Sequence, residues 1–167
     1  MKLDIGCGDH PRAGYTGVDC RALPGVEIVC PAWDILSHVA EGSVEAIYSR
    51  HMLEHLTYRD GQRTMRAWRR ALQPGGEAEI IVPDLDYHLR QLVGAPPEGP
   101  CPANSRWTNR QHGLAGLYGW QRHAHDVHQS GYTEYLLRNN LQAAGFAAVS
   151  RLPAQPWHLH VIARAGE

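Results

Sequence analysis

The sequence predicts an α/β fold built on a mostly parallel sheet. Three observations support this fold. Short β-like runs alternate with helical patterns along the chain, a glycine turn follows the first run, and acidic residues follow the next two. The 167 residues are 43% hydrophobic and 20% charged, an ordinary globular composition that fits a single domain over residues 1–167.

Seven strands are expected, each a short run rich in β-branched and other apolar residues and bounded by turn signals. They span residues 2–5, 15–19, 26–29, 44–49, 77–82, 146–152 and 158–163. Between the fifth and sixth strands lie about fifty residues without a regular pattern before the last helix. Their most irregular part, residues 94–104, is too rich in Pro and Gly for a helix or a central strand.

Two helices are expected. The first spans residues 57–72, and a Pro-Gly-Gly turn stops it. Its apolar residues recur at helical spacing, at Met65, Trp68 and Leu72. The second spans residues 133–144, where Thr133 can cap the start and Gly145 can close the end in the left-handed conformation.

The charge balance excludes several functional classes. Sixteen Lys and Arg oppose seventeen Asp and Glu, so no bulk electrostatic attraction to nucleic acid or to an anionic membrane is expected. No apolar run reaches the roughly 20 residues that span a bilayer, and the first six residues do not form a secretory signal. The four cysteines have neither zinc-site nor disulfide spacing. A cytoplasmic protein is expected.

An arginine stripe runs along the first helix, made by Arg59, Arg63, Arg66 and Arg70. Such a stripe usually forms the solvated outer face of a helix. Contact with nucleic acid is the second interpretation, but interleaved aromatic residues and further basic residues are missing.

The glycine turn Gly6-Cys7-Gly8 follows the first strand, where open α/β sheets bind ligands. Glycine there lets a ligand approach the backbone, although many such turns only connect strands. Pro11 stands where a dinucleotide site needs a third glycine, and there is no room for a phosphate-binding helix. A P-loop is absent as well. The turn therefore indicates a ligand without a pyrophosphate.

Three acids lie at strands near this turn. Asp19 ends the second strand and could accept hydrogen bonds from the hydroxyls of a ribose. Asp34 follows the third strand and could accept from an exocyclic amine. Asp4 lies inside the first strand, where burial requires donors, and the amides of the glycine turn are the expected ones. For each acid alone, a solvated loop position is the simpler interpretation.

In this order, the segments LDIGCGDHP, GVD, WDIL, GSVEAIYSRHMLEHL and LQPGGEAEIIVPDL resemble class I S-adenosylmethionine-dependent methyltransferases. The chain is most similar to short bacterial members of the methyltransferase-11 type. The resemblance covers about residues 1–85, with a weaker similarity in HQSGYTEYLLRNNLQAAGF. It implies a Rossmann-like sheet of seven strands in the order 3-2-1-4-5-7-6, with the last strand antiparallel.

The resemblance also implies roles for particular residues in binding S-adenosylmethionine. The residues matching its methionine-binding motif are Asp4, Gly6, Cys7 and Gly8. Asp19 matches the acid on the ribose, Asp34 the acid near the adenine amine, and Ser49 and Arg50 the segment whose backbone lines the methionine end.

The chain departs from the family pattern in the Asp9-His10-Pro11 turn, and its first crossover helix is missing or reduced. Residues 86–131 are expected to form a substrate lid or insert. In this segment Trp107, Tyr118 and Trp120 fit either core positions or a wall that stacks on substrate.

The histidines suggest candidates for acid–base chemistry rather than a metal site. His51 and His55 lie four residues apart, but the zinc-protease pattern needs Glu directly after the first His, and no third ligand is evident. No metal is expected. His51 is the first candidate for a general base and His128 the second, whereas His55 is expected to be a hydrogen-bonded core residue. For His123 and His125, a place in an exposed polar loop fits as well as a place in the acceptor pocket.

The sequence therefore predicts a methyltransferase that acts on oxygen of a small molecule or sugar. A non-catalytic cofactor-binding or regulatory module of the same fold is the first alternative, since the chain is short and lacks the first helix. A methyltransferase for RNA or protein is the second, supported only by the arginine stripe. Each of these functions is compatible with an oligomer.

Overall fold

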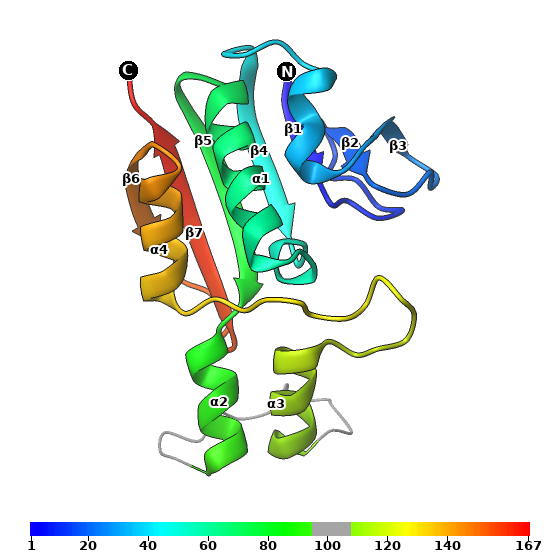
Figure 1. The fold of residues 1–167 in the computed structure, drawn as a ribbon, viewed down its shortest axis with the longest axis vertical. Helices are drawn as coiled ribbons and strands as arrows, with labels where there is room; N and C mark the ends of the chain where they lie inside the picture. The colour runs from blue at the N-terminus through cyan, green and yellow to red at the C-terminus, as the bar shows by residue number, and fades with distance from the viewer. Residues whose placement is uncertain (95–107) are drawn as a thin grey trace.

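The computed structural model describes residues 1–94 and 108–167, so most of the Pro- and Gly-rich segment, together with Cys101 and Trp107, lies outside the described residues. A seven-stranded sheet forms the centre (Figure 1), in the order β3-β2-β1-β4-β5-β7-β6. Only β7 runs antiparallel to its neighbours. The strands are β1 (Lys2–Ile5), β2 (Thr16–Asp19), β3 (Val26–Val29), β4 (Val44–Arg50), β5 (Leu72–Pro83), β6 (Phe146–Arg151) and β7 (His158–Ala165). The expected number, order and direction of the strands are confirmed.

The strand β5 is longer than expected at both ends. Its first residue, Leu72, already pairs with Val44 of β4, so the preceding helix passes directly into the strand. The sequence placed Leu72 in the helix because its apolar spacing continues that of Trp68. In the structure Leu72 is extended and closes the helix as its C-cap.

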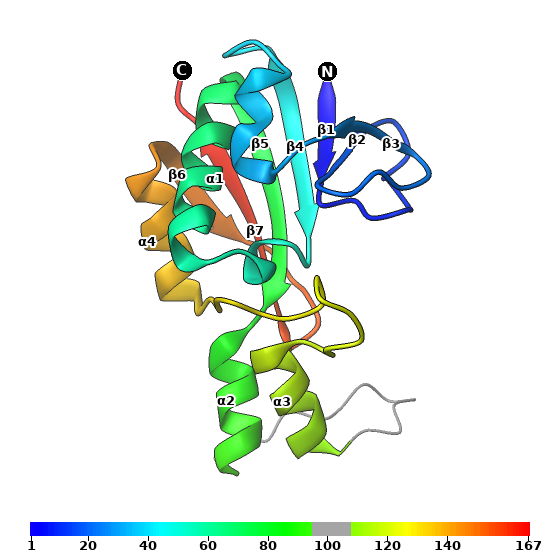
Figure 2. The same ribbon diagram turned by 45° about the vertical axis from the view of Figure 1, so that its right-hand side comes forward.

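Three helical segments pack on one face of the sheet (Figure 2): α1 (Tyr58–Ala71), α4 (Glu134–Ala143) and the short 3-10 helix η1 (Ala32–Ser37). Thr133 caps α4 through Leu136, and Gly145 follows it with φ 98°, as expected. Met65 and Trp68 of α1 are fully buried. All four members of the arginine stripe are exposed on the opposite side of α1, which confirms the solvated face.

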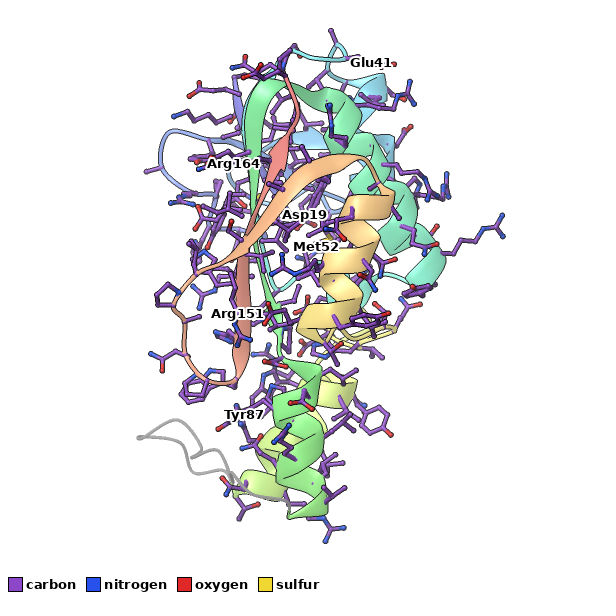
Figure 3. The ribbon with its side chains drawn as sticks, turned by 90° about the vertical axis from the view of Figure 1, so that its left-hand side faces the viewer. Asp19, Glu41, Met52, Tyr87, Arg151 and Arg164 are labelled. Carbon is purple, nitrogen blue, oxygen red and sulfur yellow. The ribbon has the colours of Figure 1, made fainter. Side chains whose placement is uncertain are left out.

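No described helix covers the other face of the sheet (Figure 3), and polar side-chain contacts lie there instead. Arg12, in the loop between β1 and β2, reaches across this face. Its guanidinium donates to Glu79 at 2.7 Å and lies 4.3 Å from the Tyr48 ring centroid. Glu79 also contacts His160 at 3.0 Å. The first crossover is thus a loop, as expected, and the Arg12 side chain holds it against the sheet.

The segment between β5 and α4 contains two helices that the sequence prediction missed, α2 (Leu85–Val93) and α3 (Asn109–Tyr118). They lie side by side beyond the carboxyl ends of β4 and β5, away from α1 and α4 (Figures 1 and 2). Their contact is made partly by polar side chains. The Oε1 atom of Gln91 lies 3.1 Å from Nδ1 of both His88 and His112, and all three residues are buried.

Within the described ranges, none of the helices combines the length and the apolar character that crossing a membrane requires.

Candidate functional site

The glycine turn brings a left-handed backbone to the carboxyl end of β1. Gly6 has φ 79° and Gly8 has φ 61°, a region that favours glycine. A Cβ on Gly6 would lie 2.2 Å from Cγ of Met52, so Met52 already fills the space beside this glycine. A Cβ on Gly8 would meet nothing within 4 Å. The open approach expected from the turn therefore lies at Gly8 rather than at Gly6.

Asp4 is buried, but its hydrogen-bond donor differs from the expected one. Its Oδ2 accepts from the backbone amide of Arg12 at 2.7 Å, whereas the amides of Gly6 and Cys7 donate to Val18. Burial raises the pKa of Asp4, and the Arg12 amide offsets this only in part. In this structure Asp4 holds the crossover loop on the sheet.

Of three further predicted residues, two have side chains that contact the protein itself. The Cys7 thiol donates to the Gly8 carbonyl at 3.3 Å, and burial raises its pKa to about 11. The Ser49 hydroxyl is buried and donates to the Ile5 carbonyl at 2.9 Å, joining β4 to β1. Arg50 is exposed at the end of β4. Because the Cys7 and Ser49 side chains are engaged in this way, contact of these two residues with a ligand would involve backbone groups, which is also what the resemblance implies for Ser49.

Asp19 lies at the carboxyl end of β2 with a nearly buried carboxylate. It accepts hydrogen bonds from the Gly8 amide and from the Arg21 amide and Nε, each at 3.0 Å. Burial alone would raise its pKa, but the Arg21 side chain and the two amides lower it below the ordinary value. Asp19 is therefore a fixed anion, and Arg21 is the group that a ligand would have to share or displace.

A cavity of about 420 Å³ opens at this edge of the sheet, which we call the rim cavity. Its lining includes Gly6, Asp19, Arg21 and Trp33. Asp34 does not line it. This acid is exposed, and its carboxylate accepts from Ser37 at 2.8 Å. The structure thus brings Asp19 and the glycine turn together and leaves Asp34 outside.

A second cavity of about 430 Å³, the histidine cavity, lies beside the first. Six imidazoles line it, those of His51, His55, His88, His112, His128 and His158, together with Trp120 and Trp157. Burial lowers the pKa of His88 to about 4, and burial with the nearby His51 lowers that of His158 to about 3. Burial also lowers the pKa of His112 and His128. These four imidazoles are therefore neutral at pH 7.

His51 lies where the two cavities meet, and it lines both of them. Its Nδ1 is 3.1 Å from Oε1 of Glu54, a carboxylate that is 1% exposed. The His51 ring also packs edge-on against that of His158, with centroids 4.6 Å apart. With φ 52°, His51 is one of the two described non-glycine residues with positive φ, and such strain is concentrated at functional sites.

The segment 119–130 forms a wall between the cavities. Gly119 begins it with φ 77°, where a Cβ would collide with the Asp126 carbonyl at 2.3 Å. Asp126 lines both cavities and accepts from Arg122 Nε at 2.6 Å. His123 and His125 are exposed on this wall and line the rim cavity.

His55 and His128 approach Glu54 from different parts of the chain. His55 is hydrogen-bonded, as expected, through its Nδ1 to the Val127 carbonyl at 3.1 Å, but it lines both cavities and is only half-buried. The expected core position is therefore wrong. His128 lines the histidine cavity.

Several residues of the site were not identified from the sequence: Arg21, Trp33, Met52, Glu54, His88, His112, Trp157 and His158. Glu54 stands in the quoted EHL segment, so its position could have been noted there. His88, His112, Trp157 and His158 come together only through the packing of α2, α3 and the start of β7. Arg21, Trp33 and Met52 come from the segments after β2, in η1 and after β4, which meet at the rim cavity. Trp120 lines the histidine cavity, which favours the substrate-wall interpretation, and Tyr118 is 53% exposed.

Comparisons with known proteins match this arrangement to one family. A family model described as a methyltransferase domain matches residues 2–151. No curated protein matches the sequence.

Solved structures with the same fold cover nearly the whole chain, at low sequence identity. One is the 1,6-didemethyltoxoflavin N1-methyltransferase of Burkholderia thailandensis, solved with bound 1,6-didemethyltoxoflavin and S-adenosylhomocysteine. It is 18% identical to this chain, with a TM-score of 0.62, and the match covers 99% of this chain and 71% of that one. An S-adenosylmethionine-dependent methyltransferase of Methanosarcina mazei is 16% identical with TM-score 0.62, covering 99% and 92%. The CurJ carbon methyltransferase is 16% identical with TM-score 0.61, covering 99% of this chain and 48% of that chain. The chain thus spans about half of this last relative.

Proposed function

The chain belongs to the methyltransferase domain family, and from this premise we propose that it transfers a methyl group from S-adenosylmethionine to a hydroxyl group of a small molecule or sugar. The rim cavity would hold the cofactor, and the histidine cavity would hold the acceptor. The Burkholderia N1-methyltransferase, with bound S-adenosylhomocysteine and 1,6-didemethyltoxoflavin, supports the choice of cofactor and of a small-molecule acceptor.

The residues of the rim cavity fit a nucleoside that carries a sulfonium group. The carboxylate of Asp19 lines this cavity and can accept from ribose hydroxyls, and Gly8, whose amide donates to Asp19, has open space where a Cβ would lie. Trp33 offers an aromatic surface for the base. S-Adenosylmethionine, when bound, supplies a methyl group on a sulfonium, whose transfer needs alignment and the exclusion of water more than covalent help.

His51 is the residue that we propose as general base. A neutral imidazole can take the proton of a hydroxyl acceptor, and the buried Glu54 carboxylate holds Nδ1 as the donor, which leaves Nε2 free to accept a proton. The single observation that carries the proposal is the place of His51, which lines both cavities. His128, donating from Nδ1 to the Gly116 carbonyl at 2.9 Å, is the second candidate.

The histidine cavity is suited to a polar ring. Trp120 and Trp157 line it beside neutral imidazoles, an arrangement that can stack on a sugar or aromatic acceptor and accept its hydrogen bonds. We assign the described parts of residues 86–131 to the cover of the acceptor, because α2, α3 and the segment 119–130 supply most of this lining.

A non-catalytic cofactor-binding module is the second candidate, and one observation favours it. Arg21 holds the Asp19 carboxylate, and Met52 fills the space beside Gly6, so the chain's own side chains occupy part of the rim. A methyltransferase for RNA or protein finds no comparable support. Two arginines of the stripe are paired, Arg63 with Asp60 and Arg70 with Glu41, on the outer side of α1.

Incubation with S-adenosylmethionine and a panel of hydroxylated sugars and phenols separates the two candidates. An enzyme releases S-adenosylhomocysteine only with an acceptor that fits, and mass spectrometry of the product locates the methyl group on oxygen. Binding of S-adenosylhomocysteine with no turnover on any acceptor would favour the module. Methylation at nitrogen or carbon would keep the family activity and reject the oxygen acceptor.

A further inference from the structure

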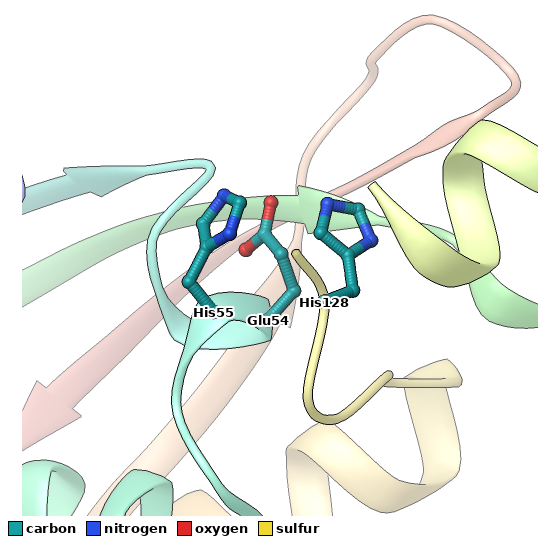
Figure 4. A group of neighbouring side chains, drawn as sticks. All are labelled: Glu54, His55 and His128. Carbon is teal, nitrogen blue, oxygen red and sulfur yellow. The ribbon is translucent and has the colours of Figure 1, made fainter. Parts of the chain in front are cut away.

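Two histidines and a glutamate face one another at the wall of the histidine cavity. Glu54 and His55 belong to the short 3-10 helix η2 (Leu53–His55), and His128 comes from the segment before α4. Their candidate ligand atoms all lie within 4.8 Å of one another. Figure 4 shows the Glu54 carboxylate flanked by the two imidazole rings. The rings themselves are 4.9 Å apart between centroids.

Both imidazoles are held by backbone carbonyls. Nδ1 of His55 lies 3.1 Å from the Val127 carbonyl, and Nδ1 of His128 lies 2.9 Å from the Gly116 carbonyl. A carbonyl only accepts, so Nδ1 is the protonated nitrogen in each ring and Nε2 carries the lone pair. Histidines that bind metals in proteins are commonly oriented in this way, by a carbonyl or carboxylate on the second nitrogen.

The third group is a carboxylate with one unused oxygen. Glu54 is 1% exposed, and its Oε1 contacts His51. Its Oε2 is buried and has no hydrogen-bond partner among the residues that the structure describes. An ionised carboxylate oxygen removed from water without a partner is costly, and a bound cation would remove that cost.

Backbone contacts hold the three side chains in place. The amides of Gln129 and Ser130 donate to the Glu54 carbonyl at 2.8 and 3.1 Å, and the Gln129 side-chain amide donates to the His55 carbonyl at 2.9 Å. The segment carrying His128 is thus fastened to η2. A metal site depends on such support, because loosely held ligands lose affinity.

We propose that Glu54, His55 and His128 bind a divalent transition metal, with Zn²⁺ as the expected ion. Two imidazoles and one carboxylate are a ligand set of zinc sites that keep a fourth position open. Neighbouring ligand atoms of a tetrahedral ion with bonds of about 2.0–2.2 Å lie roughly 3.4 Å apart. The candidate atoms lie within 4.8 Å of one another, so side-chain rotations that move each atom by about 1 Å would complete the site.

All three ligands line the histidine cavity, so the open position of the ion faces the space assigned to the acceptor. It would take an oxygen or nitrogen atom of a polar molecule bound there. Spacing along the sequence could not reveal this site, since 72 residues separate the hydrogen-bonded partners His55 and Val127 that bring its halves together. The metal site goes beyond the proposed methyl transfer and does not depend on it.

Calorimetric titration of the untagged, chelator-treated protein with Zn²⁺ tests the site. One ion should bind per chain, and Co²⁺ should give the visible absorption of a low-coordinate imidazole site. Because loss of a group that only orients a ligand already costs about 10–100-fold in metal affinity, His55→Ala and His128→Ala should each weaken Zn²⁺ binding by more than about 100-fold. The matched control is His38→Ala, which removes an exposed histidine beyond η1 and should bind as the wild type does.

Glu54→Gln keeps the shape of the side chain and should also lose Zn²⁺ binding. Circular dichroism and binding of S-adenosylhomocysteine show whether each variant is folded. Wild-type protein that is folded and binds no Zn²⁺ would overturn the metal site and leave the methyltransferase proposal standing. Equal Zn²⁺ affinity in wild type, His55→Ala and His128→Ala would overturn it as well.

Discussion

The His51 imidazole is paired with the Glu54 carboxylate, Nδ1 to Oε1 at 3.1 Å, at the place where the two cavities meet. His51 is partly open to both cavities, whereas Glu54 is buried beneath it. A carboxylate behind an imidazole fixes the tautomer and stabilises the charge that develops when the ring takes a proton. The pair thus links the fold of η2 to the expected chemistry.

Replacing His51 by Gln should lower the turnover number with a hydroxyl acceptor by about 100- to 10,000-fold, the usual contribution of a general base. Affinity for S-adenosylhomocysteine should change little, because Asp19 and Gly8 remain. Steady-state kinetics and calorimetry measure the two quantities separately. His38→Gln, at an exposed histidine that lines neither cavity, is the matched control and should retain turnover. Full turnover in His51→Gln would reject this residue as the base.

Asp19→Asn should weaken binding of S-adenosylhomocysteine by about 10- to 100-fold, because hydrogen bonds to a charged acceptor contribute roughly 1.5–3 kcal/mol. Arg21→Ala should tighten binding a few-fold, since Arg21 competes for the Asp19 carboxylate. Asp34→Asn is the control and should have no effect, because Asp34 lies outside the rim cavity. Calorimetry checks all three. Weaker binding in Arg21→Ala would mean that Arg21 itself holds the ligand.

Gly6→Ala should destabilise the fold by about 2–4 kcal/mol, because positive φ and a collision with Met52 act together. Gly8→Ala should cost only about 1 kcal/mol, since its φ is positive but the space is open. Adding Met52→Ala to Gly6→Ala should recover only the part due to the Met52 Cγ, because the Cβ at position 52 would still lie 2.5 Å from the new Cβ. Urea unfolding measures each change. Equal losses at the two glycines would contradict the close contact.

Acid should destabilise the fold through His88, whose pKa falls from 6.5 in the unfolded chain to about 4 in the folded one, mainly by burial. The unfolded chain then binds more protons, so stability is full above pH 6.5 and is lost as the pH falls toward 4. The groups facing His88 are His112, His128, His158 and the neutral Gln91.

His88→Gln removes this titration. Between pH 6.5 and 4, the free energy of unfolding of the variant should therefore fall less steeply than that of the wild type, and the two slopes should differ by roughly 1 kcal/mol per pH unit. Urea unfolding at several pH values, with a chelator present, measures the slope. An unchanged slope would show that His88 is protonated in the folded state.

The sheet followed from the sequence because its strands are apolar and end at glycine, proline or acidic residues. The helices α2 and α3 did not, because polar residues take part in the faces that they bury. His88, Gln91 and His112 occupy positions where an apolar residue would have revealed the helical period. Their burial is stabilised by mutual hydrogen bonds, which only the three-dimensional arrangement shows.

The site followed in part. Asp19 and the glycine turn could be placed, because the carboxyl ends of parallel strands meet at one edge. The donor to Asp4 could not, since it comes from Arg12 at the far end of a loop with no regular structure. The sequence also did not reveal that His128 lies beside His55. No pattern in the residues between them indicates that the chain returns to this point.

The most direct test of nucleoside binding at the rim cavity is a crystal structure with S-adenosylhomocysteine. The ribose hydroxyls should donate to the Asp19 carboxylate, with Arg21 moved aside and the sulfur facing His51. A ligand bound elsewhere, with Arg21 still on Asp19, would contradict the assignment.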